Sequence, residues 1–379
     1  MNYEKNHIKN ADGLRGFACM AVFFSHVVNT FFPYMHGFEA QKYPFESYFL
    51  NSPFDFFYSG AAGVYVFFVL SGVVLSASFS KGFGLKKFSL FLIKRYTRLM
   101  VPVLASCIIG YVVYTGFKVN MSGISQWASR LGTYDYTLQG AIYDGTIGAF
   151  KDQKFSIYNW VLWTMRIEII GSYLLAAFFV FKFSQISLLS LFTGVMLYIY
   201  GLASNGDNTF YGLGAFFIGS FFFSSDFRIG RKTAIALFIF GLYLAGVHSN
   251  SSWYQFFYGH ADERIITDSI EMLGAIFIAM AALKSNAIDF MLSSKLAVFL
   301  GKISFSVYLT HLSFIYMIAI PTYQMSSQLV TPVLAALIAI VVCLSFTIIV
   351  SYGFYLLVDK KAVELSNYIV KRYKAAPGM

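Results

Sequence analysis

The stretch DGLRGFACMAVFFSHVV, residues 12–28, places an arginine and a histidine in an otherwise apolar run. Such a run predicts a membrane-spanning helix, because about 20 apolar residues cross the roughly 30 Å hydrocarbon core of a bilayer. Ionisable side chains at that depth are costly and usually functional. On a helix, Arg15 and His26 are about 16 Å apart along the axis and within about 20° of the same face. We therefore expect both to line one polar stripe.

The composition of the whole chain is that of a membrane protein. It is 58% hydrophobic and 12% charged, a balance that a soluble domain of this size does not show. The cysteines Cys19, Cys107 and Cys343 fall within apolar segments without metal-like spacing, so we expect packing residues and no metal site. The apolar segments predict an all-α integral membrane protein with about ten transmembrane helices, near 11–31, 62–79, 99–117, 158–181, 186–203, 208–224, 233–248, 268–283, 303–320 and 332–357.

The positive charges gather on alternate connections between these segments. With the N-terminus inside, most of the 28 lysines and arginines fall on the cytoplasmic side, and Arg166 alone lies within a helix. This distribution predicts that both termini are cytoplasmic. No small-residue cleavage site follows the first apolar run, so we expect it to be retained as the first helix. The net charge of +10 then reflects topology and attraction to membrane lipids, and no nucleic-acid partner is expected.

The chain is predicted to form a single transmembrane domain over residues 1–379, since it shows no low-complexity linker and no repeat. Two connections on the outer side, residues 33–61 and 119–157, are longer than connectors need to be and are rich in Tyr, Phe, Gly and Asp. Long loops in compact proteins are often functional. Their aromatic rings suit either sugar binding or an interfacial aromatic belt, and both interpretations stay open here.

Polar residues within the predicted spans are the candidates for catalysis. His26 is a natural general base for a hydroxyl acceptor, although a packing histidine would also fit. Tyr308 and His311 lie three residues apart in KISFSVYLTHLSF, residues 302–314, and form a second polar stripe. Arg166 and Glu168 interrupt another span and point to different sides. An unpaired Glu168 would be costly at this depth, so we expect an Arg or His partner.

Two further motifs suggest binding roles. Arg95 and Arg98 lie on one face of a helix in KRYTRLMVP, residues 94–102, and paired guanidinium groups suit phosphate oxygens. Anchoring by the positive-inside rule would explain them too. Ser71 and Gly72 lie in the middle of GVYVFFVLSGVVLS, residues 63–76, where small residues permit a close helix crossing.

Taken in order, these motifs resemble the acyltransferase 3 family of integral membrane acyltransferases. The resemblance covers nearly the whole chain and rests on DGLRGFACMAVFFSH, FFVLSGVVLS, RYTRLMVP, LWTMRIE, FYGLGAFFIGS and ISFSVYLTH. It departs from the family in Val73 after the Ser-Gly pair and in the exit of the last helix, VDKKAVEL, residues 358–365.

The resemblance implies a multi-pass enzyme of the inner membrane that moves an acetyl group from cytoplasmic acetyl-CoA to a hydroxyl of an extracytoplasmic carbohydrate. The acceptor would be a lipid-linked or cell-surface glycan such as O-antigen, exopolysaccharide or peptidoglycan. It also implies that His26 is the catalytic histidine, with Arg15 in its motif, and that Arg95 and Arg98 contact acyl-CoA. The chain lacks the hydrolase-like domain of some relatives, which implies a stand-alone enzyme that transfers the group directly.

Together the residues and the resemblance predict two sets of site residues. We assign catalytic roles to His26, Arg15, Glu168, Tyr308 and His311, and binding of acetyl-CoA to Arg95, Arg98, Ser71 and Gly72. The alternatives are a polysaccharide transporter or flippase, an acyltransferase for a small-molecule or macrolide-like acceptor, and an inactive subunit of a glycan-synthesis complex.

Overall fold

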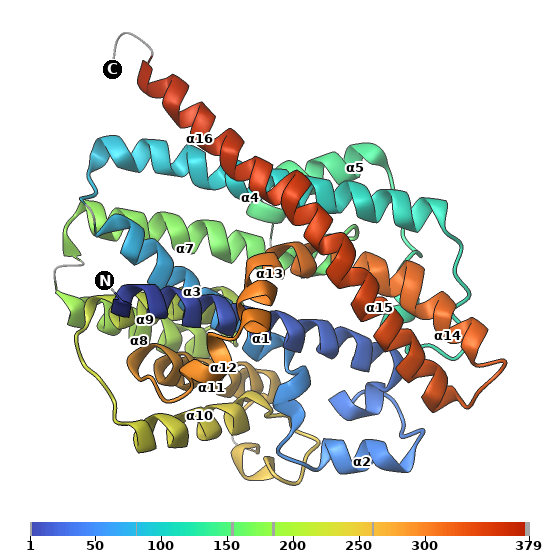
Figure 1. The fold of residues 1–379 in the computed structure, drawn as a ribbon. Coiled ribbons are helices and arrows are strands. Elements are labelled where there is room, and N and C mark those ends of the chain that lie inside the picture. The colour runs from blue at the N-terminus through green and yellow to red at the C-terminus, as the bar shows by residue number, and fades with distance from the viewer. Residues whose placement is uncertain (1, 81, 153–154, 184–185, 260, 376–379) are drawn as a thin grey trace. The chain divides into compact units, whose positions relative to one another are not determined.

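The computed structural model describes residues 2–80, 82–152, 155–183, 186–259 and 261–375, and all of its regular elements are helices (Figure 1). Within these ranges, seven helical segments are long and apolar enough to cross a membrane. They are Lys9–Phe31, Gly60–Phe79, Leu85–Gly116, Trp160–Val180, Glu263–Lys284, Lys295–Ser326 and Pro332–Tyr373. The predicted all-α class is therefore confirmed for the described residues, and the chain is a multi-pass membrane protein by helix length and composition.

The other three predicted spans coincide with shorter helices. These are α8 (Ser187–Ala203), α9 (Asn208–Ser224) and α10 (Arg231–Ala245). The long helices are α1 (Asn2–Phe31), α3 (Gly60–Phe79), α4 (Leu85–Gly116), α7 (Trp163–Val180), α11 (Glu263–Lys284), α13 (Lys295–Phe314) and α15 (Pro332–Phe354).

Helix starts follow local sequence signals. The Asp207 side chain accepts a hydrogen bond from the Thr209 amide at the start of α9 (2.8 Å). Asp262 caps α11 in the same way through the Arg264 amide (2.9 Å). These bonds satisfy amides that have no partner within the helix. Pro332 opens α15 at a position where a missing N–H costs nothing.

Short elements fill the connections. They are η1 (Pro33–His36), α2 (Pro44–Leu50), η2 (Asp55–Tyr58), η3 (Ala128–Arg130), α5 (Leu138–Tyr143), η4 (Asp144–Gly148), α6 (Ala149–Lys151), η5 (Trp160–Leu162), η7 (Gln255–Phe257), α12 (Asp289–Leu292), η8 (Ile315–Ala319), α14 (Ile320–Ser326), η9 (Tyr355–Asp359) and α16 (Lys360–Ala375).

The chain divides into two compact units, and four long helices contribute residues to both. Unit 1 comprises residues 1–25, 34–88 and 170–304, and unit 2 comprises residues 26–33, 89–169 and 305–379. The prediction of a single domain stays a prediction.

In unit 1, α3 packs against α9 and α11, and α11 packs against α10. Gly72 lies where α3 crosses α9, and a Cβ atom there would collide with the Phe216 carbonyl. Gly219 on α9 meets the Val69 carbonyl in the same way. Glycines at both positions therefore let the two helix backbones touch, which is the packing role that the sequence offered for Gly72.

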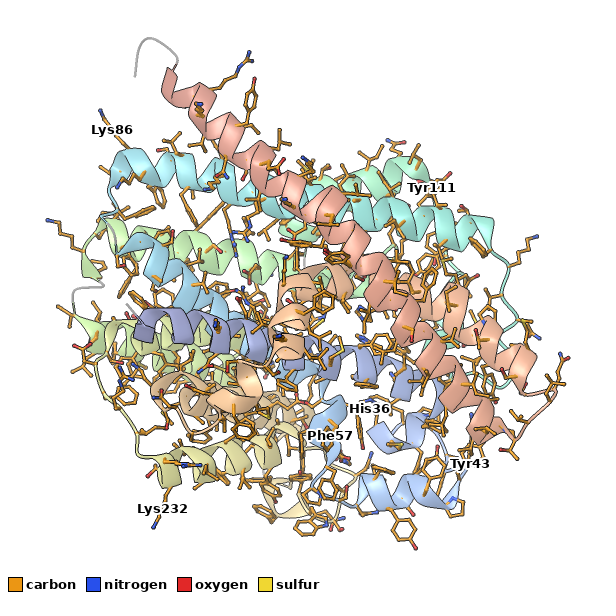
Figure 2. The ribbon with its side chains drawn as sticks, viewed as in Figure 1. His36, Tyr43, Phe57, Lys86, Tyr111 and Lys232 are labelled. Atoms are coloured by element: carbon orange, nitrogen blue, oxygen red, sulfur yellow. The ribbon has the colours of Figure 1, made fainter. Side chains whose placement is uncertain are left out.

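Basic and aromatic residues of unit 1 lie apart. Figure 2 shows Lys86 at the start of α4 and Lys232 at the start of α10, both pointing outward at the left of the view. Tyr43, His36 and Phe57, from the connection between α1 and α3, lie to the right. The exposed lysines thus lie at helix ends away from the aromatic connection.

In unit 2, α14 and α15 form a helical hairpin, and α15 continues through η9 into α16 (Figure 1). A cluster around Tyr114, Leu131 and Tyr316 packs the connection after α4 against the region of η8. The Tyr316 hydroxyl donates to the Phe117 carbonyl oxygen (2.9 Å). The connection of residues 119–157 is thereby held to the helices of its own unit.

All three cysteines are buried and form no disulfide. The Cys19 thiol donates to the Ser304 carbonyl oxygen (3.2 Å). The prediction that they are packing residues is confirmed.

Candidate active site

The two predicted catalytic histidines, His26 and His311, meet in unit 2. The Nδ1 atom of His26, on α1, lies 2.8 Å from the Nε2 atom of His311, on α13. The Nδ1 atom of His311 lies 3.0 Å from the Val307 carbonyl oxygen one turn earlier in its own helix. His311 is almost fully buried, with 1% of its surface exposed. The sequence indicated two separate polar stripes, and the structure joins them through the hydrogen bond between His26 and His311.

The Val307 carbonyl fixes the direction of this chain. A carbonyl oxygen only accepts, so the Nδ1 atom of His311 carries a proton and donates to it. In a neutral imidazole the other nitrogen then accepts, so the Nε2 atom of His311 accepts from the Nδ1–H of His26. The lone pair of His26 is consequently on Nε2. That tautomer is the one a general base needs at that atom.

An aromatic ring also packs against the His26 side chain. The Trp127 ring stacks on the His26 ring, with centroids 5.3 Å apart and planes 7° apart. Trp160 meets Trp127 edge to face (5.2 Å), and the Arg130 guanidinium lies over Trp160 (5.8 Å). The Ser125 amide donates to the Thr30 carbonyl oxygen at the end of α1 (3.2 Å). The connection of residues 119–157 thus contributes the ring that stacks on His26.

Sequence reasoning did not identify Trp127 and Trp160 as site residues. It flagged the aromatic richness of residues 119–157 as a whole, but an irregular connection has no periodicity from which to infer which ring faces a helix. Asn159 and Trp160 lie at the start of the predicted span 158–181 and were missed because no local signal distinguishes them there. The Asn159 side-chain amide donates to the Leu309 carbonyl oxygen (2.7 Å), two residues before His311, and to Ser106 (3.2 Å).

Tyr308 anchors α13 to the start of α7. Its hydroxyl donates to the Val161 carbonyl oxygen (2.8 Å) and lies 2.9 Å from the Thr164 hydroxyl. Its ring centroid is 6.2 Å from that of His311. Tyr308 is therefore close to the histidine chain, and its catalytic role stays a prediction.

The expected partner of Glu168 is Arg95. The carboxylate on α7 and the guanidinium on α4 form an ion pair in which the side chains are 13% and 11% exposed. A pair this buried is held by charge and hydrogen bonding together. The Arg95 charge is thereby balanced within the protein. The predicted Arg partner of Glu168 is thus Arg95, and the catalytic role of Glu168 stays a prediction.

Arg98 has a different environment from Arg95, although both lie on α4. It is exposed and acts electrostatically on the Asp359 carboxylate of η9. The sequence predicted that Arg95 and Arg98 bind phosphate together. In the structure Arg95 forms a buried ion pair with Glu168, whereas the Arg98 side chain is exposed.

The remaining predicted site residues belong to unit 1. Arg15 is half-buried on α1, where its charge acts on the Asp12 carboxylate. The helix is unbroken from Arg15 to His26, so the backbone keeps the spacing that predicted a shared stripe. Ser71 and Gly72 are buried on α3. Roles for these three in catalysis or binding stay predictions.

The helices of the described residues, seven of them long and apolar enough to cross a membrane, define the class of multi-pass membrane proteins. The family model described as an acyltransferase domain, that of the acyltransferase 3 family, matches residues 8–355. The chain belongs to this family of membrane acyltransferases, and the resemblance inferred from its motifs is confirmed. Comparison with curated proteins gives no match, and neither does comparison with solved structures.

Proposed function

We propose that the protein is an O-acetyltransferase that moves an acetyl group from cytoplasmic acetyl-CoA to a hydroxyl of an extracytoplasmic carbohydrate. The observation that carries this proposal is the chain from the Val307 carbonyl through His311 to His26. It presents a nitrogen lone pair, held by a neighbouring ring, inside a membrane acyltransferase.

The proposed reaction is a direct transfer. The Nε2 atom of His26 takes the proton of the acceptor hydroxyl while the hydroxyl oxygen attacks the thioester carbon. The bond from that carbon to sulfur then breaks, and the CoA thiolate leaves and takes the proton back from His26. His311 acts as a positioning residue, because its Nε2 atom accepts from the Nδ1–H of His26 and stabilises the imidazolium that forms. The negative oxygen needs a donor, for which the sequence suggests Arg15, Ser71 and Tyr308. The Tyr308 hydroxyl would first have to leave the Val161 carbonyl oxygen, to which it donates in the structure.

For the donor substrate, we propose that Arg98 contacts the phosphates of acetyl-CoA. Its exposure on α4 supports this role, because a guanidinium at the surface can reach phosphate oxygens while its charge also acts on the Asp359 carboxylate. The role of Arg95 is then to place α4 through its bond to Glu168. Ser71 and Gly72 remain sequence-based proposals for the same substrate.

Arg98→Ala should weaken acetyl-CoA binding and leave the amount of folded protein unchanged. Loss of a hydrogen bond to a charged group costs about 1.5–3 kcal/mol, so the KM for acetyl-CoA should rise by about tenfold or more with little change in kcat. Lys86→Ala is the matched control, since Lys86 is an exposed basic residue on the same helix. An Arg98→Ala enzyme with unchanged KM would remove the phosphate assignment.

For the topology, we propose ten spans with both termini on the cytoplasmic side of the inner membrane. Helices α8, α9 and α10 have 17, 17 and 15 residues, and a rise of 1.5 Å per residue makes them roughly 23–26 Å long. Helices somewhat shorter than the core can cross where the bilayer thins around them. The outward position of Lys86 and Lys232 supports this arrangement (Figure 2).

For the acceptor, we propose a lipid-linked or cell-surface glycan. The aromatic rings of the outer connection support it, since Trp127 lies directly on the His26 ring and flat aromatic rings suit sugar faces. A small-molecule acceptor is the alternative that the same geometry admits.

The test is the O-acetyl content of the surface polysaccharide, measured by proton NMR in the host, in a deletion strain and in the deletion strain complemented with the chain. We expect the acetyl signal per sugar to disappear on deletion and to return on complementation, with the total amount of polysaccharide unchanged. A fall in total polysaccharide at constant acetylation would indicate a transporter instead. An unchanged acetyl signal on deletion would refute the glycan acceptor.

A further inference from the structure

Unit 1 encloses an apolar cavity that the proposed reaction does not use. Its volume is about 550 Å³, within the range of small-molecule sites. Six helices and η2 form its walls, and apart from Ser59 every lining side chain is apolar. The cavity exists because small residues line it on two of the helices, among them Ala18 and Ala21 on α1 and Gly63 on α3.

The cavity follows the membrane-spanning part of α1. Its wall on that helix extends from Leu14 to Phe24, a rise of about 15 Å. Two aromatic residues that line it are also exposed at the surface, Phe17 at 43% and Phe57 at 62%. The cavity is therefore open toward the medium that surrounds the helices, and an occupant can lie alongside α1.

Filling this cavity with water and leaving it empty would both be unfavourable. The only polar side chain in the wall, Ser59, already donates to the buried Glu271 carboxylate (2.9 Å), and a buried water needs two or more polar partners. An empty space of this size would forfeit the dispersion contacts of all its lining atoms. The medium around membrane-spanning helices is hydrocarbon. We propose that the cavity is a lipid site that holds one hydrocarbon chain of a bilayer phospholipid.

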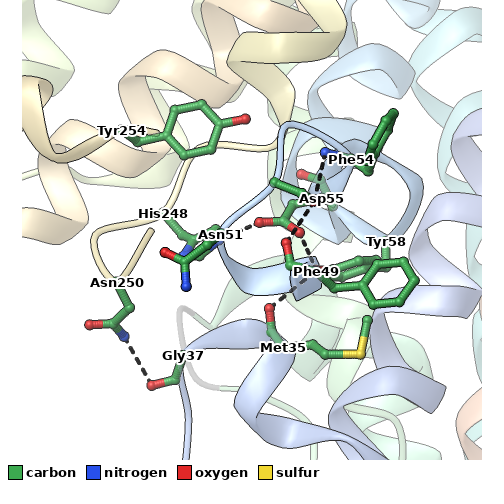
Figure 3. A network of polar contacts seen from close by, with 12 residues as sticks. Met35, Gly37, Phe49, Asn51, Phe54, Asp55, Tyr58, His248, Asn250 and Tyr254 are labelled. Atoms are coloured by element: carbon green, nitrogen blue, oxygen red, sulfur yellow. Dashed lines mark hydrogen bonds and ion pairs between the residues drawn. The ribbon is translucent and has the colours of Figure 1, made fainter. Parts of the chain in front are cut away.

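A polar network fixes the wall at one end of this lipid site. Phe56 and Phe57 line the cavity from η2, whose first residue is Asp55 and whose last is Tyr58. Figure 3 shows His248 and Tyr58 both reaching Asp55. The Asp55 carboxyl group accepts from the Tyr58 hydroxyl, and its other oxygen is hydrogen-bonded to the Nε2 atom of His248. These hydrogen bonds hold the wall in place.

Two more bonds join the same segments of the chain. The Asn250 side chain donates to the Gly37 carbonyl oxygen (3.0 Å; Figure 3), and the Ser252 amide donates to the Asn51 side chain (3.1 Å). Burial lowers the pKa of His36 to about 4, so this ring next to Tyr58 is neutral at pH 7. The wall is therefore built before any lipid arrives, which lowers the cost of binding.

The test compares the wild type with Ala21→Phe, which fills the cavity from α1. Each protein is purified in detergent and analysed by native mass spectrometry. We expect one phospholipid per wild-type chain and a loss of that lipid in Ala21→Phe. Ala77→Phe is the matched control, because Ala77 is a half-buried alanine on α3 outside the cavity wall, and it should keep its lipid. Ala21→Leu adds less volume and serves if Ala21→Phe does not fold.

A second measurement uses melting temperature in lipid-free detergent with added dioleoyl phosphatidylglycerol. A ligand that binds only the folded state raises the melting temperature, so we expect a rise for the wild type and for Ala77→Phe and none for Ala21→Phe. Wild-type protein that carries no lipid and does not respond to added phospholipid would overturn the proposal. So would a polyisoprenoid lipid as the retained species, or equal retention by Ala21→Phe. None of these outcomes depends on acetyl transfer, so the lipid site and the proposed reaction are tested separately.

Discussion

Replacing His26 by alanine should lower the rate of acetyl transfer by about 10²- to 10⁴-fold, the range for loss of a positioned general base. The Nδ1–H of His26 is committed to His311 and the ring is stacked on Trp127, so rotamer and tautomer are both set before the substrate arrives. An alanine removes this preset proton acceptor. The measurement is release of CoA from acetyl-CoA by membranes that contain equal amounts of each protein.

A histidine outside the proposed reaction provides the control. His36 follows α1 and bonds through Nε2 to the Ser25 carbonyl oxygen (3.0 Å), a bond that the side-chain amide of His36→Gln can also make. We expect His36→Gln to keep wild-type activity. Full activity of His26→Ala would mean that His26 is a packing residue, and the reaction would need another base.

Two substitutions of His311 should differ in activity, because only one of them keeps a hydrogen-bond acceptor for His26. His311→Gln keeps an oxygen that can accept from the Nδ1–H of His26, whereas His311→Leu removes the acceptor. We expect Gln to retain more activity than Leu, and the pH profile of kcat to shift in Leu because the imidazolium of His26 loses its partner. Equal activity and identical pH profiles in both variants would show that His311 only fills space.

The sequence predicts the helices well, because membrane spans have a strong local signal. A helix lies at each of the ten predicted segments, since apolar length and flanking charge are properties of a single segment. His26 and His311 could be named individually for the same reason, as costly polar residues in apolar runs. Their bond could not be predicted, because two residues that are 285 positions apart meet only when α1 and α13 pack.

Residues in connections were harder to predict. Trp127 carries the stacking contact with His26, yet nothing in its local sequence distinguishes it from the other aromatic residues of residues 119–157. The apolar cavity left no sequence signal either, since it arises where Ala18, Ala21 and Gly63 leave space between helices. Such features depend on how helices pack, and hydropathy reports only how apolar each one is.

Arg95 shows how packing changes the interpretation of a motif. The motif predicts the same role for Arg95 as for Arg98, because a spacing of three residues on a helix places two side chains on one face. The structure separates them: Arg95 binds Glu168 and Arg98 is exposed. A spacing rule identifies which side chains can act together, but it does not include a carboxylate supplied by another helix.

Arg95→Ala should therefore destabilise the fold far more than Arg98→Ala. Removing one partner of a buried ion pair costs about 3–5 kcal/mol, because the other charge is left uncompensated. Glu168 is only 13% exposed, so water cannot replace the lost guanidinium. Arg98 is exposed, and its loss should change the free energy of unfolding by less than about 0.5 kcal/mol. The measurement is the melting temperature in detergent, together with the amount of folded protein in membranes.

A double substitution distinguishes lost charge balance from lost packing. Glu168→Gln removes the negative charge and keeps nearly the same volume, so Arg95→Ala combined with Glu168→Gln should recover much of the stability that Arg95→Ala loses. If the double variant recovers no stability, the Arg95 side chain stabilises α4 and α7 through packing of its aliphatic part. If Arg95→Ala is as stable as the wild type, Glu168 does not depend on Arg95, and Arg95 becomes available again as a second contact for the acetyl-CoA phosphates.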